Sequence, residues 1–417
     1  MSAAASLRKG WCPGALRPMP SGDGLLVRLR LSCGELPVRT ASAIAALGEK
    51  YGNGGIDLTQ RANLQLRGLR EADLPALTAA LDDLGLLDAN PGAEAVRNVM
   101  VSPLSGLDPT CRDGRAIARA LEAQLRSDTA LHALPAKFGF AIDGGGRWPL
   151  GAAGADIALC AHYSEARWQI ALAGGDAISE PIEEAQVAEM LVSLAKAFLR
   201  AGQPRMRDLA ARDGAAAVLA AAGLATSQRD HGATGQAHPA PGVHGVSSTI
   251  ALAAVGLPFG WIEAGELAAL AGACQPETVI RLTPWRMLIV PFIQAGAAEA
   301  FLKICGAHVL ITSPSDPRTF IDACTGAPGC ANATTRTRED AARLAGEVPH
   351  LLSTKSRLHV SGCAKGCAHR GSARFTLVGH DGRYDLILHG APGDAPHRTG
   401  IAPAALAAAL REGGHMP

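Results

Sequence analysis

Residues 56–68 read Ile56-Asp57-Leu58-Thr59-Gln60-Arg61-Ala62-Asn63-Leu64-Gln65-Leu66-Arg67-Gly68, and this stretch decides the fold because its opening recurs later in the chain. A second strand-like run, Ile280–Val290, begins with the same pattern I-x-L-T about 224 residues further on. Each run follows a segment with helical periodicity, residues 42–48 and residues 264–271. A strand and helix order that is used twice predicts a duplicated α+β chain.

Polar side chains recur with a period of two through the first run. Read as one strand, it carries a polar face made of Thr59, Arg61, Asn63, Gln65 and Arg67. Guanidinium and amide groups in this order form a donor array suited to carboxylates, which predicts Asn63, Gln65 and Arg67 as substrate-binding residues. A merely solvated sheet face is the alternative. The second run offers only Arg281 and Arg286, so only the first repeat is expected to keep a polar binding face.

Four cysteines near the C-terminus predict a metal centre: Cys324, Cys330, Cys363 and Cys367. Their spacing is C-x5-C, a gap of 32 residues, and then C-x3-C. Thiolates select soft centres such as zinc, copper(I) and iron–sulfur clusters. Paired zinc ligands lie about two to four residues apart, so a five-residue loop of small residues favours a 4Fe–4S cluster, whose irons present separate ligand positions. Zinc and unligated thiols are the alternatives.

Composition excludes several classes of protein. Hydrophobic residues make up 48% of the 417 residues and charged residues 18%, which is typical of globular domains with substantial cores. The net charge of +1 comes without a basic block, so neither nucleic acid nor an anionic membrane is an expected partner. The N-terminus lacks the apolar core of a signal peptide, and no apolar run reaches the ~18 residues that span a bilayer. The ten cysteines are therefore expected in a reducing cytoplasm.

Composition along the chain predicts five units. Residues 226–245 are polar, rich in glycine and proline, and without periodicity, which is typical of a linker. Each side of this linker is expected to hold a small α+β unit followed by a larger mixed unit. The predicted boundaries are 1–85, 86–225, 226–245, 246–300 and 301–417.

Two further cations lie outside the repeated segments. Arg97 precedes the turn-like residues 102–106, and Lys137 interrupts the apolar run 134–143, which is read as a strand. On local grounds each favours a structural role, as a residue near a cap or at the edge of a sheet. Binding of an anion is the alternative.

Together these segments resemble the sulfite and nitrite reductase superfamily. The resemblance covers nearly the whole chain and rests on LTQRANLQLRG (58–68), RNVMVSPLSG (97–106), LPAKFGFAIDG (134–144) and the cysteine motif. It implies an α+β fold in which duplicated ferredoxin-like half-domains are combined with larger mixed α/β units. It also implies a 4Fe–4S cluster beside a tetrapyrrole, held by the four cysteines, with Cys367 on the side of the macrocycle.

The same resemblance assigns candidate catalytic roles to three cations. Arg61 and Arg97 correspond to arginines that face the tetrapyrrole and its small anionic substrate, and Lys137 corresponds to the first of two active-site lysines. The second lysine of sulfite reductases falls at position 139, where this chain has Gly139. Loss of that cation weakens the case for sulfite reduction, and the glycine is expected to open space for a tetrapyrrole that serves as substrate.

The short length and residues 8–18 and 21–25 resemble the branch of the superfamily that forms precorrin-3B. This resemblance implies oxygen-dependent conversion of precorrin-3A, with hydroxylation of the meso carbon between rings A and D and closure of a γ-lactone. It implies a mononuclear non-haem iron in addition to the cluster. A separate electron-donating reductase is expected, since no dinucleotide-binding motif is present. A sirohaem-dependent sulfite or nitrite reductase and a non-catalytic electron carrier are the alternatives.

The sequence assigns no ligands to the mononuclear iron. His359, His369, His380 and His389 lie near the cysteines in sequence, but none is paired with a carboxylate at a helical spacing. Cys12 lies within the segment 8–18 and is read as a buried thiol.

Overall fold

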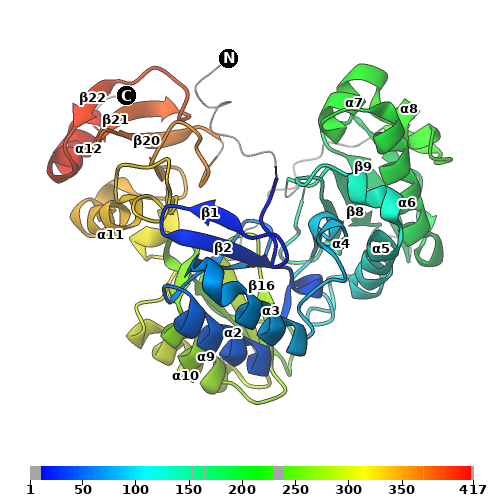
Figure 1. Cartoon of the computed structure of the whole chain (residues 1–417), viewed down its shortest axis with the longest axis horizontal. Helices are drawn as coiled ribbons and strands as arrows, with labels where there is room; N and C mark the ends of the chain where they lie inside the picture. Colours follow the sequence, from blue (N-terminus) through cyan, green and yellow to red (C-terminus); the bar gives the residue numbers. More distant parts are fainter. Residues whose placement is uncertain (1–10, 152–153, 163–165, 229–238, 370, 415–417) are drawn as a thin grey trace.

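Two antiparallel five-stranded sheets form the centre of the molecule, and a larger unit lies on either side of them (Figure 1). The computed structural model describes residues 11–151, 154–162, 166–228, 239–369 and 371–414. Within these ranges, no helix has both the length and the apolar character that a membrane span requires.

Each central sheet takes four strands from one repeat and one strand from the other. The first sheet has the order β1 (Met19–Ser21), β2 (Gly24–Leu29), β5 (Leu64–Leu69), β4 (Gly55–Leu58), β15 (Trp261–Glu263). The second has the order β13 (Gly242–Gly245), β14 (Ala251–Gly256), β17 (Met287–Phe292), β16 (Val279–Leu282), β3 (Glu35–Pro37). The repeats therefore exchange edge strands through the pairs β15–β4 and β3–β16.

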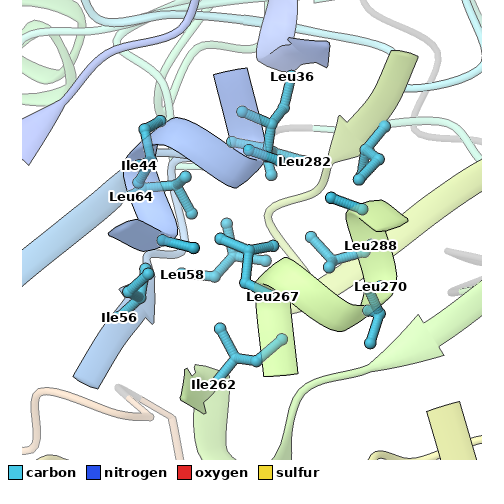
Figure 2. Packing of buried hydrophobic residues seen from close by; sticks show 14 of the residues in the cluster. Leu36, Ile44, Ile56, Leu58, Leu64, Ile262, Leu267, Leu270, Leu282 and Leu288 are labelled. Atoms are coloured by element: carbon cyan, nitrogen blue, oxygen red, sulfur yellow. The ribbon is translucent and has the colours of Figure 1, made fainter. Parts of the chain in front are cut away.

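The two repeats share one hydrophobic core. Helix α2 (Val38–Tyr51) of the first repeat packs against α9 (Ala264–Gly272) of the second. Figure 2 shows Ile44 and Leu64 from one repeat and Leu267 from the other within the same buried cluster. Helices α3 (Leu74–Asp83) and α10 (Ala295–Ala307) complete these layers. The two predicted half-domains thus form a single packed body, because neither repeat can bury its apolar face alone.

Matching backbone conformations confirm the predicted duplication. Cys33 and Phe259 both have φ 57°, in the short turns after β2 and β14. Ala62 and Arg286 have φ 53° and 60°, in the turns that join β4 to β5 and β16 to β17. Residues other than glycine rarely adopt this left-handed conformation, so its recurrence at equivalent positions points to two copies of one unit.

The opening stretch is a hairpin and not the single strand that we predicted. β4 ends at Leu58, β5 begins at Leu64, and the backbone N–H of Asn63 donates to Oγ1 of Thr59 across the turn (3.2 Å). Asp57 lies opposite Gln65 in the antiparallel register, so their side chains emerge on the same face of the sheet. The polar residues before and after the turn therefore still share one face. The polar face therefore exists, but Arg61 lies in its turn.

The flanking units each contain one mixed sheet. The first sheet comprises β6 (Val99–Val101), β7 (Phe140–Asp143), β8 (Ile157–Ala161), β9 (Arg167–Leu172), β10 (Ala177–Ser179), β11 (Ile182–Glu183) and β12 (Thr226–Gln228). The second comprises β18 (Ile321–Ala323), β19 (Leu358–Ser361), β20 (Ala373–His380), β21 (Arg383–Gly390) and β22 (Arg398–Ile401). Their helices are α4 (Pro91–Val96), α5 (Arg115–Ser127), α6 (Glu184–Ala201), α7 (Met206–Asp213) and α8 (Ala215–Ala220) in the first unit, and α11 (Thr337–Glu347) and α12 (Leu406–Gly414) in the second.

The flanking units also repeat each other. In both sheets the first three strands in chain order run parallel and the fourth is antiparallel. Ser102 and Cys324 each follow the first of these strands. The N–H of Gly144 donates to Oγ of Ser102 (2.9 Å), as the N–H of Gly362 donates to Sγ of Cys324 (3.2 Å). The first unit therefore carries a hydroxyl where the second carries the first cysteine of the motif.

Strands occupy both ends of the segment 226–245 that we predicted as a linker. β12 pairs with β10 at the edge of the first flanking sheet, and β13 pairs with β14 at the edge of a central sheet. Residues 229–238 of this segment lie outside the described residues. Glycine and proline do not prevent edge strands, whose outer backbone groups need no partner within the sheet.

Candidate functional site

The four predicted cysteines line one cavity of about 180 Å³. Cys324 follows β18 and Cys363 follows β19, and the parallel pairing of these strands brings their carboxyl ends together. Cys330 and Cys367 come from the two loops that continue from these ends. The structure therefore assembles the complete thiol set that the spacing predicts.

Glycine allows the first cysteine loop to fold tightly. Gly326 has φ 68°, and a Cβ atom there would lie 2.4 Å from Oγ1 of Thr337. That hydroxyl donates to the carbonyl of Cys324 (2.6 Å). Burial raises the pKa of the Cys363 and Cys367 thiols, so a stable thiolate at these positions needs a positive centre beside it.

The spacing of the thiols along the chain, C-x5-C followed by C-x3-C, favours a cluster over a single ion. Among the described residues, no three His, Cys, Asp or Glu side chains converge on a point where one metal ion could bind. Zinc binds its sulfur ligands at about 2.3 Å, which would draw four thiolates close together. A 4Fe–4S cubane accepts them at four separate corners. The donor set therefore fits the cubane.

Arg67 connects a central sheet to the cysteine loop and does not line the larger cavity described below. It donates to the backbone carbonyl of Gly329, which lies between Cys324 and Cys330, and Oγ of Ser21 donates to the same carbonyl (2.6 Å). Its other partners are the carboxylates of Asp23 (3.1 Å) and Asp57 (3.3 Å). Arg67 was predicted to bind substrate, but these contacts make it a support for the loop.

A second cavity, of about 370 Å³, adjoins the thiol cavity and is strongly cationic. Positive side chains line it at five positions, which are Arg28, Arg61, Lys137, Arg286 and Arg338. Among the described residues of the lining, Asp57 is the one carboxylate, and it is already paired with Arg67 and Arg338. Cys324 and Cys367 line both cavities. A bound anion in the larger cavity would thus lie beside the thiol centre.

The arginines of this cavity are half-buried, and Arg28 and Arg61 have neutral hydrogen-bond partners. Burial lowers the pKa of Arg28, Arg61 and Arg286, which means that their charged forms are poorly solvated. Arg28 donates to Oε1 of Gln65 (2.7 Å), and Arg61 donates to the carbonyl of Lys137 (2.7 Å). These neutral partners orient the two guanidinium groups without cancelling their positive charge. A ligand rich in carboxylates would supply the missing negative charge.

Asp57 orders the base of the cavity. Burial alone would raise its pKa, but the neighbouring guanidinium groups of Arg338 and Arg67 outweigh that effect and hold the pKa below its usual range. Asp57 also accepts a bond from the amide of Gln65 (3.4 Å). Gln65 lies in the lining and orients Arg28, and its predicted role in substrate binding stays a prediction.

Several lining residues were not predicted from the sequence. Arg286 enters the cavity from the second repeat, whose expected lack of a binding face is thereby corrected. Arg286 and Ala62 have left-handed backbone conformations at equivalent positions of their hairpins. An alignment of the two I-x-L-T segments would therefore indicate Arg286 as a candidate site residue. Arg28 and Arg338 carried no distinguishing pattern, and Cys12 lines the cavity although it was read as a buried thiol.

The structure places the other expected residues as follows. Lys137 lines the cavity but lies in a turn before β7, because the N–H of Phe138 donates to the carbonyl of Pro135 (2.7 Å). Asn63 is buried in its hairpin turn and does not belong to the lining. Gly139 is also outside the lining, and its N–H donates to the carboxylate of Asp156 (3.3 Å). The expectation that Gly139 opens space in the site is therefore not supported.

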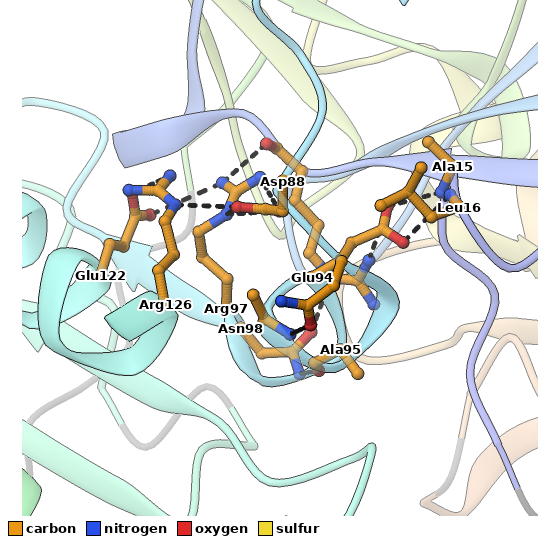
Figure 3. Close-up of polar contacts among 12 residues, drawn as sticks. Ala15, Leu16, Asp88, Glu94, Ala95, Arg97, Asn98, Glu122 and Arg126 are labelled. Carbon is orange, nitrogen blue, oxygen red and sulfur yellow. Dashed lines mark hydrogen bonds and ion pairs between the residues drawn. The ribbon is translucent and has the colours of Figure 1, made fainter. Parts of the chain in front are cut away.

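The structure corrects the position expected for Arg97, which does not line the cationic cavity. Figure 3 shows it instead among buried polar contacts with Asp88. Arg97 is 6% exposed and forms an ion pair with Asp88 (2.9 Å). It also donates to the carbonyl of Arg30 (2.8 Å), while Arg126 pairs with the same Asp88 (2.8 Å). A cation that is already compensated by a buried carboxylate has a structural role here, as the local reading of the sequence indicated.

Comparison with protein families identifies two segments of the chain. Residues 17–84 match the nitrite/sulfite reductase ferredoxin-like half domain, and residues 92–227 match the nitrite and sulphite reductase 4Fe-4S domain. The second match falls on the first flanking unit, where Ser102 takes the place of Cys324. The thiol cavity lies in the other copy of that unit.

Comparison with individual proteins finds similarity over most of the chain. A precorrin-3B synthase from Sinorhizobium sp is 34% identical over 401 residues, which cover 94% of this chain and 85% of that protein. A ferredoxin–nitrite reductase from Synechococcus elongatus is 35% identical over 155 residues, covering 36% of this chain and 30% of that protein. The solved structure of the Mycobacterium tuberculosis NirA protein has a TM-score of 0.73 at 19% identity, covering 92% of this chain and 79% of that one, and shows that the fold is shared.

Proposed function

Because this chain belongs to the precorrin-3B synthase family, we propose that it converts precorrin-3A to precorrin-3B with dioxygen. In this reaction the meso carbon between rings A and D is hydroxylated and the ring A acetate closes a γ-lactone. One oxygen atom enters the tetrapyrrole and the other leaves as water, which requires two electrons and two protons. Lactone closure involves no further redox change. The observation that carries the proposal is the cationic cavity whose wall shares Cys324 and Cys367 with the thiol cavity.

The cationic cavity would bind the substrate through its carboxylates. An early corrinoid precursor is fringed with acetate and propionate groups, and each can accept charge-assisted hydrogen bonds from a guanidinium. Arg28, Arg61 and Arg286 approach the cavity from different turns and strands, so several side chains of the macrocycle can be fixed at once. Lys137 adds a further cation. Fixing the ring in this way would hold one meso carbon in the reacting position.

We propose that Cys324, Cys330, Cys363 and Cys367 hold a 4Fe–4S cluster. The cavity that the four thiols share supports this assignment, as does the match of the other copy of this unit, residues 92–227, to a 4Fe-4S domain. When bound, the cluster supplies electrons from a separate donor to the oxygen chemistry. Arg67 and Ser21 hold the loop that carries two of the four ligands. A mononuclear non-haem iron completes the proposed cofactor set.

A sirohaem-dependent reductase is the second candidate, because part of the chain is similar to a ferredoxin–nitrite reductase and the cavity could hold a resident tetrapyrrole. The visible spectrum distinguishes the two functions. Sirohaem has an intense Soret band and a red band, whereas an iron–sulfur cluster alone has a broad absorption. The family membership over 94% of the chain favours the synthase.

The test is turnover of precorrin-3A by anaerobically purified protein, supplied with a chemical reductant and then with dioxygen. We expect precorrin-3B, about four sulfides per chain and no Soret band. Cys324→Ser should abolish the cluster and turnover, whereas Cys160→Ser, outside the thiol cavity, should leave both unchanged. Reduction of nitrite by a protein with a Soret band would contradict the synthase assignment, and equal losses in the two variants would contradict the cluster assignment.

A further inference from the structure

A fully buried histidine lies two residues before Ser361, which lines the thiol cavity, and it lacks hydrogen-bond partners among the described residues. His359 in β19 is 0% exposed, and neither its Nδ1 nor its Nε2 has a partner in the part of the chain that the structure describes. A buried polar group without a partner is unfavourable, and such groups call for an explanation such as a bound ion. This requirement is independent of the cysteines, because His359 does not belong to either cavity lining.

Two further metal-binding side chains surround His359. Asp322 is its register partner in the adjacent parallel strand β18, so both side chains emerge on the same face of the sheet. The ring of His369 lies 5.7 Å from the ring of His359 in an edge-on arrangement. Nδ1 of His369 is 3.5 Å from Oδ2 of Asp322. Two imidazoles and one carboxylate thus approach one another from two strands and a loop.

This group adjoins the cationic cavity through Arg286, which lines that cavity and pairs with Asp322 (3.3 Å). Asp322 precedes Cys324 by two residues, and His369 follows Cys367 by two. The residues between them, Ala323 and Ala368, line the cationic cavity. Any centre bound by the three side chains would therefore lie beside both the cluster and the substrate.

We propose that Asp322, His359 and His369 are the ligands of the mononuclear iron, a refinement that rests on the proposed function for its role in turnover. Two imidazole nitrogens and one carboxylate oxygen are a donor set that divalent first-row metals prefer, and they leave positions open for other ligands. In the described residues no three such side chains yet have the geometry of a bound ion, so binding requires the His369 ring to turn from Asp322 toward a shared point.

Substrate binding is expected to strengthen this site. Asp322 now pairs with Arg286 (3.3 Å) and Arg357 (3.0 Å), and two guanidinium groups oppose the approach of a dication. Arg286 also lines the cationic cavity. A substrate carboxylate that takes over Arg286 would release part of the Asp322 charge for the metal. By linkage, the metal would then strengthen tetrapyrrole binding by the same factor.

The test measures metal content and affinity without turnover. Cluster-loaded wild-type protein should bind one cobalt(II) ion per chain, with an affinity that rises when the octacarboxylate uroporphyrin I is added. Asp322→Asn, His359→Leu and His369→Leu should each weaken cobalt(II) binding by on the order of tenfold or more while retaining four sulfides. The exposed His380 provides the matched control, because it lies on β20 of the same sheet, and His380→Ala should bind cobalt(II) like the wild type.

The outcomes separate this inference from the proposed function. Unchanged cobalt(II) binding in all three variants would overturn the ligand set, whether or not the enzyme forms precorrin-3B. Loss of metal together with loss of sulfide would also overturn it, because the variants would then act through the cluster. Selective loss of the additional metal would support the ligand set even if precorrin-3A were not converted, and in that case the proposed function alone would fail.

Discussion

At the scale of single residues, burial and pairing decide which cations can bind a ligand. Arg28 is half-buried and Arg97 is buried, yet Arg28 has an amide as its partner and Arg97 has a carboxylate. The first retains an uncompensated charge at a cavity, whereas the second is neutralised inside the protein. Residue type and spacing in the sequence do not distinguish a ligand-binding arginine from a structural one. The distinction depends on the side chains that the fold places beside each arginine.

This contrast predicts opposite effects of two substitutions. Arg28→Ala should weaken binding of uroporphyrin I by about 1.5–3 kcal/mol, the value of a hydrogen bond to a charged group, with little change in stability. Arg97→Met should lower the free energy of unfolding by about 3–5 kcal/mol, because Asp88 would lose its buried partner, while the folded fraction binds normally. Fluorescence titration and urea unfolding measure the two quantities. Weaker binding in folded Arg97→Met would restore Arg97 to the substrate site.

Asp88 also predicts how stability depends on pH. Burial alone would raise its pKa, but Arg97 and Arg126 hold the pKa below its usual range. A carboxyl with a lowered folded-state pKa adds stability above its unfolded pKa of about 3.9 and loses it as the pH falls through the folded value. The gap in urea midpoint between wild type and Asp88→Asn should be constant from about pH 5 to 8 and shrink below about pH 4. A gap that grows on acidification would contradict this assignment.

At the scale of secondary-structure elements, the sequence indicated the duplication and the alternation of polar residues, and the structure contains both. The pattern I-x-L-T recurs because equivalent hairpins need the same threonine, whose hydroxyl also binds the backbone N–H of Met287 in the second copy (3.2 Å). The hairpin turn itself was missed, since Ala62 adopts a left-handed conformation that alanine does not signal. Arg286 was missed for the same reason.

Arg67 shows how a strand residue can support the cysteine loop without lining the cationic cavity. It lies in β5 and serves Ser21, Asp23, Asp57 and the carbonyl of Gly329 at once. Lysine has a single ammonium group and cannot reproduce this planar set of contacts. Arg67→Lys should therefore bind uroporphyrin I like the wild type but lose its cluster several-fold faster in air, followed by absorbance. Arg383→Lys, an exposed arginine of β21, should lose the cluster at the wild-type rate. A weakened tetrapyrrole affinity in Arg67→Lys would favour the original substrate-binding interpretation.

At the scale of the whole molecule, duplication has produced two copies of each unit but one functional centre. Ser102 stands where the second flanking unit has Cys324, and its hydroxyl is engaged with Asp143 (3.1 Å). The first unit keeps the fold without the thiols, and the cationic cavity combines Lys137 from this unit with residues of both repeats. The site therefore depends on the assembly of the entire chain. Sequence patterns could not predict this assembly, because strand periodicity does not identify the partner strand.

The exchange of edge strands predicts that the two halves of the chain cannot fold apart. Residues 1–240 alone would leave β3 unpaired and one edge of β4 without β15, and residues 241–417 alone would expose the apolar face of α9. Because both repeats bury their side chains in one core, neither fragment has a core of its own at the centre. Co-expressed fragments should form a 1:1 complex that retains the cluster and unfolds cooperatively in urea, whereas each fragment alone should aggregate or unfold without cooperativity. Size-exclusion chromatography with light scattering and denaturation of each sample measure this. A single fragment that is monomeric and unfolds cooperatively would show that the repeats are independent domains. The shared core would then be an interface between two domains that fold separately, and folding would not depend on it.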